Sequence, residues 1–369
     1  MAIASGAAPS TALTLLVCTV GRASLPQVLD AIARLDLPPP GRVETVVVDN
    51  HGGDPAIASA VAALRVRVPA LAVRLIVEPR QGVAHARKRG IAVARGKLIA
   101  FVDDDCLLSE DWVRRTLAFA AEHPRAGVIG GRTELRWSRE PSSLALAYGE
   151  SLARQDWGEE RFRVAADENR CPCGAGLVLR REAILDAGWL TRGRLVGRHV
   201  RRPGAGEDTE VALMVREAGW EVWYEPTLRV QHLVGDERTH LAHLLWLHYG
   251  FGRAEIYLRL LGRRLPLDRR RRWRGVGWAL AELPPVLRRF WRGFVRYEHE
   301  RPTWLIRFVW TLGCINGAGA LLVRGRVDRS AGGAPAAPRP LASAPTARRH
   351  ARRGPGPPAR ARRTAARRG

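Results

Sequence analysis

Several signatures of common enzyme classes are missing from this sequence. Gly96-Lys97 is followed by Leu98 instead of Ser or Thr, so the phosphate loop of P-loop nucleotide hydrolases is absent. No Gly-x-Ser-x-Gly segment is present, which excludes the nucleophile elbow of α/β-hydrolases. Helix-turn-helix and zinc-finger patterns are also lacking, so no specific nucleic-acid partner is expected.

Cysteine is scarce and has no spacing typical of a disulfide framework. The five cysteines are Cys18, Cys106, Cys171, Cys173 and Cys314. This odd, scattered set predicts free thiols in a reducing compartment, and no Cys or His pair at zinc spacing accompanies Cys171-Pro-Cys173. No basic residue precedes the apolar run near the N-terminus, and Thr19 and Arg22 end it early. We therefore expect a buried strand there and no secretory signal.

Negative charge is scarce in the last third of the chain. The formal net charge is +24, of which residues 1–249 contribute only +2, residues 250–326 contribute +12 and residues 327–369 contribute +10. Such a basic segment indicates a polyanionic partner, either lipid headgroups or nucleic acid. Because tryptophan and arginine are interleaved after residue 240, an anionic membrane surface is the expected partner.

The basic part of the chain contains one long apolar segment. Trp304–Val323 has about the length of a membrane span, but Arg307, Asn316 and three glycines interrupt it, which favours an interfacial or re-entrant segment. The composition after Val327 predicts a disordered tail. We divide the chain into a folded domain at 1–239, a basic Trp-rich helical extension at 240–326 and a basic tail at 327–369. A cytoplasmic protein, peripheral to the inner face of the cell membrane, is expected.

Short apolar stretches alternate with helical ones in the first 110 residues. The pattern predicts strands over Leu13–Thr19, Thr45–Val48, Val73–Val77 and Leu98–Val102, and helices over Leu25–Leu35, Ile57–Leu64 and Val83–Arg95. This alternation is typical of an α/β fold with a mainly parallel sheet flanked by helices. Ligands bind such sheets beyond the carboxyl ends of the strands.

A second group of elements is expected between residues 170 and 235. Strands are predicted over Ala175–Leu179, Glu221–Tyr224 and Arg229–Gln231, the last two flanking a turn at Pro226, and helices over Arg181–Ala187 and Asp208–Ala218. The loop His199–Gly206, rich in arginine and glycine, is expected to be mobile and to act as a lid.

Three adjacent carboxylates follow the strand Leu98–Val102. Asp103, Asp104 and Asp105 would repel one another by about 4 kcal/mol per pair at ~4 Å and an effective dielectric of ~20, so they need a counter-charge. A divalent cation with oxygen ligands supplies one and also binds a diphosphate. The two-residue alternation of an extended strand places Asp103 and Asp105 on one side as ligands and turns Asp104 elsewhere. A helix N-cap run before Trp112 is the alternative interpretation.

The ordered set of motifs resembles the inverting family 2 glycosyltransferases, which have the GT-A fold. The matching segments are Leu16-Val17-Cys18-Thr19-Val20-Gly21-Arg22, Val47-Val48-Asp49-Asn50, Gly82-Val83-Ala84-His85-Ala86-Arg87-Lys88-Arg89-Gly90, Asp103-Asp104-Asp105 with Trp112, Gly206-Glu207-Asp208 and Val230-Gln231-His232. The resemblance covers about residues 13–235. It implies that residues 1–239 form the catalytic domain.

The resemblance implies a nucleotide-diphospho-sugar donor. Residues on the donor side would be Thr19, Arg22, Asp49 and Asn50 at the nucleoside, and Arg87 near the base or the phosphates. Asp104, which the strand period turns away from the metal, is expected on the donor side as well, facing the sugar or a helix dipole. A uracil-reading carboxylate often occupies the position of Asn50 in this family, so the donor base stays open.

The resemblance also implies a metal and a general base. Asp103 and Asp105 would hold Mg²⁺ or Mn²⁺ on the diphosphate, with His232 as a third ligand. Asp208 would take the proton of the acceptor hydroxyl during an in-line displacement that inverts the anomeric carbon, and Glu207 would orient Asp208 or the acceptor. An ordinary helix N-cap is the alternative interpretation of Asp208, and a polar residue after a strand that of His232.

The acceptor is expected to be a glycan, such as a growing polysaccharide, or a lipid-linked sugar. Two other functions stay open. A sugar nucleotidyltransferase can share this architecture, but Thr19-Val20-Gly21-Arg22 is too short for its phosphate loop. The arginine-rich tail could bind RNA nonspecifically.

Overall fold

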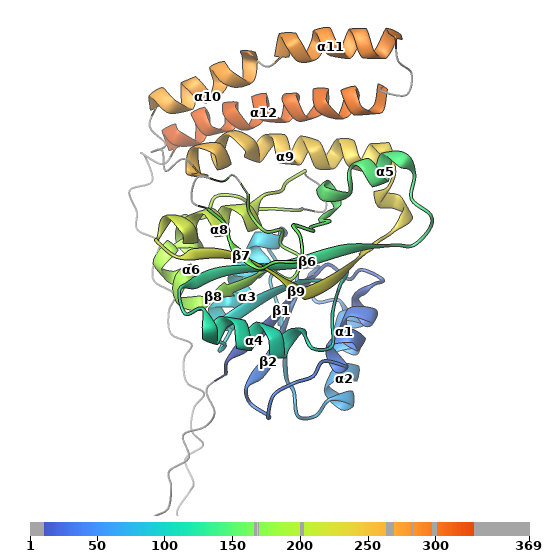
Figure 1. Ribbon diagram of the computed structural model, residues 1–369, viewed down its shortest axis with the longest axis vertical. Coiled ribbons are helices and arrows are strands. Elements are labelled where there is room, and N and C mark those ends of the chain that lie inside the picture. Colours follow the sequence, from blue (N-terminus) through green and yellow to red (C-terminus); the bar gives the residue numbers. More distant parts are fainter. Residues whose placement is uncertain are drawn as a thin grey trace, which may run out of the picture. The chain divides into compact units, whose positions relative to one another are not determined.

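A mixed β-sheet organises the structure, a computed structural model that describes residues 11–165, 168, 170–199, 203–262, 269–281, 283–296 and 301–327 (Figure 1). Four parallel strands form one half of the sheet in the order β3-β2-β1-β4. These strands are β1 (Leu13–Thr19), β2 (Val43–Asp49), β3 (Ala72–Val77) and β4 (Leu98–Asp103). All four were predicted from the sequence, with ends that differ by at most two residues.

The second half of the sheet contains antiparallel pairs. Its strands are β5 (Cys106–Leu108), β6 (Ala126–Trp137), β7 (Phe162–Arg163), β8 (Val178–Arg180) and β9 (Glu221–Val234). Strand β8 is antiparallel to both β4 and β6, whereas β6 and β9 are parallel. The short strands β5 and β7 pair with β9.

Helices cover both faces of the sheet. One apolar core packs α1 (Leu25–Ala33), α2 (Pro55–Arg67) and α4 (Trp112–Glu122) against inward side chains such as Leu15 and Val17. The other packs α3 (Val83–Val93), α6 (Arg181–Ala187) and α8 (Glu207–Glu217) against Leu16 and Val46. Because neighbouring residues of β1 point into different cores, the strand is buried on both faces, as its unbroken apolar sequence predicts.

The prediction of two strands around a turn at Pro226 is wrong. Strand β9 continues through this residue, and its pairing with β6 shifts register between Gly130 and Arg132. Proline has no N–H group to donate, so it is tolerated where the ladder is irregular. The long strand β6 was not predicted. Short helices α5 (Ser143–Ala147), η1 (Gly149–Leu152) and α7 (Trp189–Arg192) complete this half.

In the described part of the chain, four helices follow the sheet domain and the short helix η2 (Asp236–Arg238). Helix α9 (Leu241–Gly262) packs against α8 and α12 (Arg301–Val327), and α10 (Arg269–Ala281) and α11 (Leu283–Arg296) pack against α12 (Figure 1). Among the described residues, Arg301–Leu322 is the one helical stretch long and apolar enough to cross a membrane by length and composition alone. The division at residue 239 stays a prediction, and the tail beyond Val327 lies outside the described residues.

Candidate functional site

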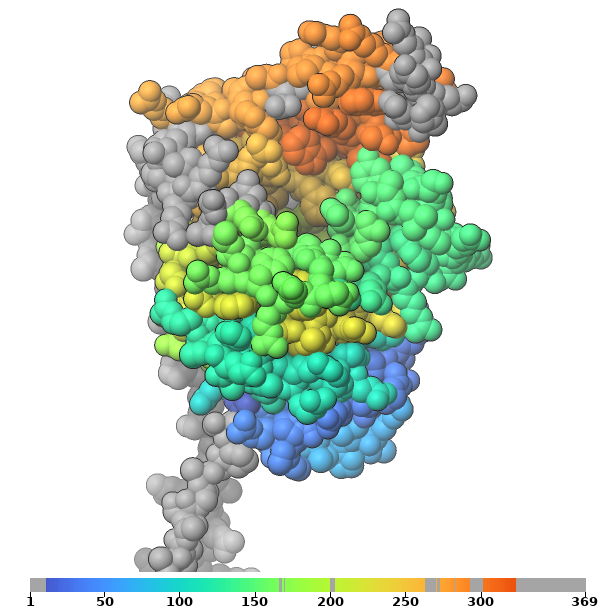
Figure 2. Space-filling model, in the orientation of Figure 1, coloured from blue at the N-terminus to red at the C-terminus, as the bar shows by residue number. Residues whose placement is uncertain are grey.

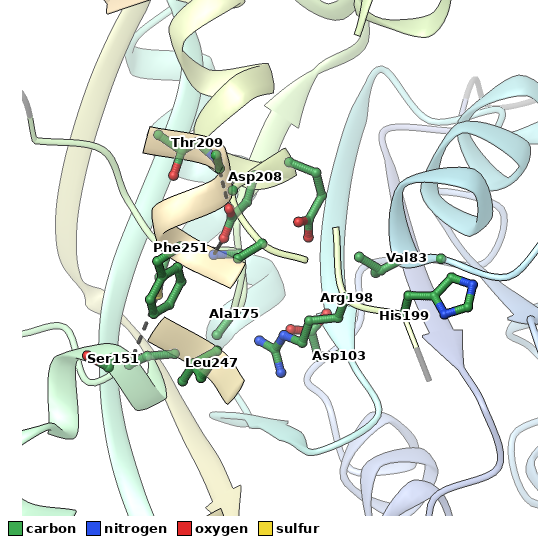
Figure 3. A pocket seen from close by; sticks show the side chains of 18 of the residues that line it. Val83, Asp103, Ser151, Ala175, Arg198, His199, Asp208, Thr209, Leu247 and Phe251 are labelled. Atoms are coloured by element: carbon green, nitrogen blue, oxygen red, sulfur yellow. Dashed lines mark hydrogen bonds between the residues drawn. The ribbon is translucent and has the colours of Figure 1, made fainter. Parts of the chain in front are cut away.

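A cavity of about 1040 Å³ opens beyond the carboxyl ends of β1 and β4. Its walls come from these strand ends, the start of α8 and one side of α9, and Figure 3 shows Asp208, Asp103 and Phe251 around the same space. Nine of the eleven predicted site residues line it: Thr19, Arg22, Asn50, Arg87, Asp103, Asp104, Asp105, Glu207 and Asp208. The ends of the parallel strands, together with the starts of α3 and α8, therefore bring together residues that are up to about 190 positions apart.

The aspartate triplet receives its counter-charges from arginines. Arg87 pairs with Asp103 at 2.9 Å, Arg22 with Asp104 at 3.1 Å, and Arg238 with Asp105 at 2.8 Å. The repulsion among the three carboxylates therefore does not by itself require a metal ion.

The expected alternation along the triplet is wrong. Strand β4 ends at Asp103, and the next two residues form a turn, so the period of an extended strand no longer applies. As a result Arg22 reaches both Asp104 and Asp105, at 3.1 Å and 3.3 Å.

Asp104 is buried against the loop that follows β1. The Thr19 hydroxyl donates a hydrogen bond of 2.7 Å to its carboxylate, and Ser24 donates to its backbone carbonyl. Burial raises the pKa of Asp104 to about 6, although the charge of Arg22 opposes this shift. Thr19 thus holds Asp104 in place.

Asp105 is in a different electrostatic environment. Burial acts to raise its pKa, but the neighbouring His232 and Arg238 hold the pKa well below the ordinary value. Asp105 is therefore ionised at neutral pH, and it lines the cavity with 3% of its surface exposed.

Arg87 connects the two halves of the site. Its guanidinium donates to Asp103 and, at 3.0 Å, to Glu207, and it lies 4.3 Å from the centre of the Phe101 ring. The surrounding carboxylates raise the pKa of Arg87 in spite of its complete burial. Burial, together with the charge of Asp208, raises the pKa of Glu207 to about 7. Arg87 fixes the first residue of α8 relative to the end of β4.

Asp208 is presented to the cavity at the first turn of α8. One carboxylate oxygen accepts from the backbone N–H of Gly174 at 2.8 Å, and the other from the N–H of Thr209 at 2.8 Å (Figure 3). The side chain is half-buried, in contrast to the buried Glu207. A carboxylate oriented by two amides and still accessible can accept a proton from a bound hydroxyl.

Two residues predicted to bind the sugar donor, Asn50 and Asp49, use their side chains for hydrogen bonds to backbone groups of adjacent loops. The amide of Asn50 donates to the carbonyls of Glu78 and Arg80 and accepts from the N–H of Gly82, which fixes the loop before α3. Asp49 does not line the cavity, and its carboxylate accepts from four backbone amides of residues 51–54.

His232 is fully buried outside the cavity lining. Its Nε2 lies 3.2 Å from Asp105 Oδ1, and its Nδ1 has no hydrogen-bond partner among the described residues. Asp105, Cys106 and His232 offer ligand atoms within 4.8 Å of one another. Of the predicted metal ligands, Asp105 and His232 are therefore close enough to share a divalent cation, whereas Asp103 is paired with Arg87. Arg238, 3.3 Å from His232 Nε2, supplies positive charge at the same place.

Comparison with known proteins decides the family. A family model described as "Glycosyltransferase like family 2" matches residues 9–246, well over half of the chain. The chain belongs to glycosyltransferase family 2. It is therefore an enzyme that transfers a sugar from a nucleotide-sugar donor, and nine of the residues predicted for its site line the cavity.

Individual relatives of this glycosyltransferase are distant. The succinoglycan biosynthesis protein ExoM of Rhizobium meliloti (strain 1021) is 28% identical over 240 residues, which cover 62% of this chain and 69% of ExoM. A glucosyl-dolichyl phosphate glucuronosyltransferase of Haloferax volcanii is 23% identical over 187 residues, which cover 50% of this chain and 58% of the relative.

A solved structure supports the fold. The mannosyltransferase PcManGT from Pyrobaculum calidifontis, in complex with GDP-Man and Mn²⁺, matches with a TM-score of 0.50 at 20% identity over 85% of this chain and 87% of its own. The enzyme thus has the predicted α/β GT-A fold, with a mixed, mostly parallel sheet flanked by helices.

Three parts of the candidate site were not predicted from the sequence. Arg198 and Arg238 line the cavity, and so does a face of α9 that includes Trp246, Leu247 and Phe251. Arg238 follows the Val-x-His motif by six residues, but nothing in the sequence shows that it turns back to Asp105. The apolar spacing in α9 is visible in the sequence, yet it does not reveal that the helix packs over the sheet.

Proposed function

We propose that this enzyme moves a sugar from a nucleotide-diphosphate donor to a hydroxyl of a glycan or lipid-linked acceptor, with inversion at the anomeric carbon. The observation that carries the proposal is the position of Asp208. Its carboxylate is fixed by two backbone amides and faces the same cavity as the aspartate triplet. An acceptor and a donor diphosphate can therefore meet between them.

Asp208 is the proposed general base. It removes the proton of the acceptor hydroxyl as the new C–O bond forms and the bond from the anomeric carbon to the diphosphate breaks. Glu207 is the proposed positioning residue, because it is buried and paired with Arg87. This pair holds the start of α8, and hence Asp208, at a fixed distance from the donor side.

The donor is proposed to lie over the ends of β1 and β4. Asp103 and Asp105, with His232 as a third ligand, would hold Mg²⁺ or Mn²⁺, which when bound neutralises charge on the diphosphate. Arg22 is the residue free to adjust there, since its side chain is 37% exposed. Thr19 and Asn50 line the same end of the cavity, whereas Asp49 supports the adjoining turn.

The acceptor is proposed to lie along α9. Trp246, Leu247 and Phe251 give this wall an apolar and aromatic surface that suits the face of a sugar ring or the first carbons of a lipid. The names of the two sequence relatives, one in succinoglycan biosynthesis and one acting on a glucosyl-dolichyl phosphate, support a polysaccharide-building or lipid-linked pathway.

A cytoplasmic site at the inner face of the membrane is proposed for the enzyme. Residues 250–326 carry a net charge of +12, and Trp273 and Trp291 are 53% and 65% exposed. Arginine and tryptophan suit the anionic headgroup region. A peripheral position would bring α9 and the acceptor to the membrane surface.

The test is a thermal-shift panel of UDP, GDP and dTDP, each with and without Mn²⁺. One diphosphate at about 100 times its Kd should stabilise the enzyme by about 2.7 kcal/mol in the presence of the metal. Asp208→Asn should keep this stabilisation and lose transfer by about 10²- to 10⁴-fold, whereas the exposed Glu217→Gln on the same helix should keep both. Absence of any stabilisation by the three diphosphates, or full activity of Asp208→Asn, would contradict the proposal.

A further inference from the structure

The segment before α8 is tied to α3 by its backbone. The carbonyls of Val196 and Arg198 accept hydrogen bonds of 3.1 Å from the N–H groups of Ala84 and Val83, in the first turn of α3. These two amides are among those that a helix start leaves without internal partners. The segment at residues 196–198 is therefore anchored, although residues 200–202 of the predicted lid lie outside the described part of the chain.

Gly197 makes this close approach feasible. Its φ of +71° lies in the left-handed region, and a Cβ at this position would stand 2.4 Å from a carboxylate oxygen of Glu207 and 2.5 Å from a Val83 side-chain carbon. The backbone amides of Arg194 and Leu195 donate to the buried carboxylate of Glu210, at 2.6 Å and 3.3 Å. The backbone next to Arg198 is thus held from both α3 and α8.

The Arg198 side chain points into the cavity. In Figure 3 it extends from this segment and lies beside Asp103, while Asp208 stands on the opposite wall. Burial opposes its charge, but the carboxylates of Asp103, Asp105, Glu207 and Asp208 together raise the pKa of Arg198. The guanidinium is therefore positively charged in the enzyme.

Arg198 differs from the arginines that neutralise the triplet. Arg22, Arg87 and Arg238 each lie within 3.1 Å of a carboxylate oxygen. Arg198 feels the charge of four carboxylates, but among the described residues none of their oxygens lies within 4.0 Å of its guanidinium, and its side chain makes no hydrogen bond there. Its N–H donors are thus available to a ligand.

We propose that Arg198 binds the diphosphate of the sugar donor. A guanidinium matches phosphate oxygens in a two-pronged arrangement, and such charged hydrogen bonds are roughly twice as strong as neutral ones. The position between the triplet and Asp208 is where the leaving diphosphate of the proposed function would lie. Arg198 would then stabilise the charge that develops on the leaving group as the sugar is transferred.

This inference rests on the proposed function and is tested with a probe common to all diphosphate donors. Inorganic pyrophosphate in excess Mg²⁺ is titrated into the full-length enzyme by calorimetry. Arg198→Ala should weaken its binding by about 10- to 100-fold, as expected for one charge-assisted contact of ~1.5–3 kcal/mol. Arg198→Lys should recover part of this loss because it keeps the charge but not the planar fork.

Arg192→Ala provides the matched control. This residue is exposed on α7, six positions before Arg198, and does not line the cavity, so its loss should leave pyrophosphate affinity unchanged. A twofold or smaller change in Arg198→Ala, with wild-type binding intact, would overturn the inference, and a changed pH profile alone would assign Arg198 to positioning Asp208. If Arg198→Ala does not fold, the pyrophosphate affinity of Arg198→Lys is the test: weaker binding than the wild type supports the inference, and an unchanged affinity overturns it. Failure of the wild type to bind pyrophosphate and all three nucleoside diphosphates would instead reject the proposed function.

Discussion

Opposite charges at the site are arranged as specific pairs. Each aspartate of the triplet has an arginine partner, and Arg87 serves a second carboxylate in Glu207. Buried ion pairs of this kind contribute little to net stability, because desolvation offsets the attraction, but removing one partner is costly. We infer that the pairs serve geometry: they hold the donor side of the site fixed relative to Asp208.

Ionisation of Glu207 should make the free energy of unfolding depend on pH. Its pKa is raised by burial from 4.5 to about 7, so the folded state binds the proton more tightly than the unfolded state. Stability contributed by this proton is complete below pH 4.5 and is lost as the pH rises through 7, by roughly 3 kcal/mol in total. Glu207→Gln cannot ionise. Its unfolding free energy in urea should therefore fall less between pH 5 and pH 8 than that of the wild type.

The exposed Glu217→Gln, at the other end of α8, is the control and should keep the wild-type pH slope. Equal slopes for Glu207→Gln and the wild type would show that Glu207 ionises normally in the folded enzyme.

Many residues that line the candidate site could be predicted from the sequence, and those that could not have an identifiable physical cause. Six of the nine predicted residues that line the cavity end or follow parallel strands, which finish at one edge of the sheet and could be located from the sequence. The other three, Arg87, Glu207 and Asp208, come from α3 and α8. The directions of Asp104 and Asp105 were not predictable, since the turn after Asp103 depends on Thr19 and Ser24 from another strand end. Arg198 and Arg238 were missed because tertiary contacts alone bring them to the cavity.

Among the elements, α9 and α12 cross at unusually short range. A Cβ on Gly252 would stand 2.1 Å from the carbonyl oxygen of Trp310, and one on Gly317 would stand 2.1 Å from that of Arg253. Only glycine permits this backbone contact, as in helix pairs that associate through small residues. Because α9 also lines the cavity, the position of α12 affects the shape of the candidate site.

The close contact between α9 and α12 therefore predicts that Gly317→Ala destabilises the enzyme. The added methyl group meets a backbone carbonyl, which cannot move aside like a flexible side chain, so a loss of about 1–3 kcal/mol is expected in urea denaturation. Transfer activity should fall with it, since α9 must shift. Gly319→Ala on the same helix has no atom within 4 Å of its new Cβ and should be neutral or stabilising by up to ~1 kcal/mol. Equal stability of the two variants would refute the close crossing.

Element prediction succeeded where local pattern and packing agree. Strand β1 was predicted to the residue, because its seven residues are apolar or β-branched and buried on both faces. Strand β6 was missed because Gly130 and Gly131 lower its strand propensity. Both are required by close neighbours, since a Cβ on Gly131 would stand 2.0 Å from the carbonyl of Leu228.

Helix α9 of the basic extension shares the cavity with the sheet domain. Helix α9 contributes Trp246, Leu247 and Phe251 to the cavity, so truncation after residue 239 would remove one wall of the site. The composition near residue 240 changes from a neutral sheet domain to basic helices. This change did not indicate that a helix of the basic part lines the same cavity as the sheet domain. Tests of membrane binding consequently require point substitutions in the full chain.

Trp291 is the best-placed residue for a point substitution that tests membrane binding. It is 65% exposed on α11, where Val286 and Phe290 face inward and Arg288, Arg289 and Arg292 add charge. Figure 2 shows α11, in orange, at the surface of the molecule. Trp291→Ser should weaken binding to vesicles containing phosphatidylglycerol roughly tenfold, or ~1.4 kcal/mol, because an interfacial indole is lost.

Val66→Ser is the control for this substitution. Val66 is 80% exposed but belongs to α2 in the sheet domain, so its loss should leave vesicle co-sedimentation unchanged. Raising the salt concentration should weaken both the wild type and Trp291→Ser, since the arginines attract anionic lipid through screened charge. Equal binding of Trp291→Ser and Val66→Ser at low salt would exclude α11 as the membrane-facing helix and would leave charge attraction elsewhere in the extension as the cause of any binding.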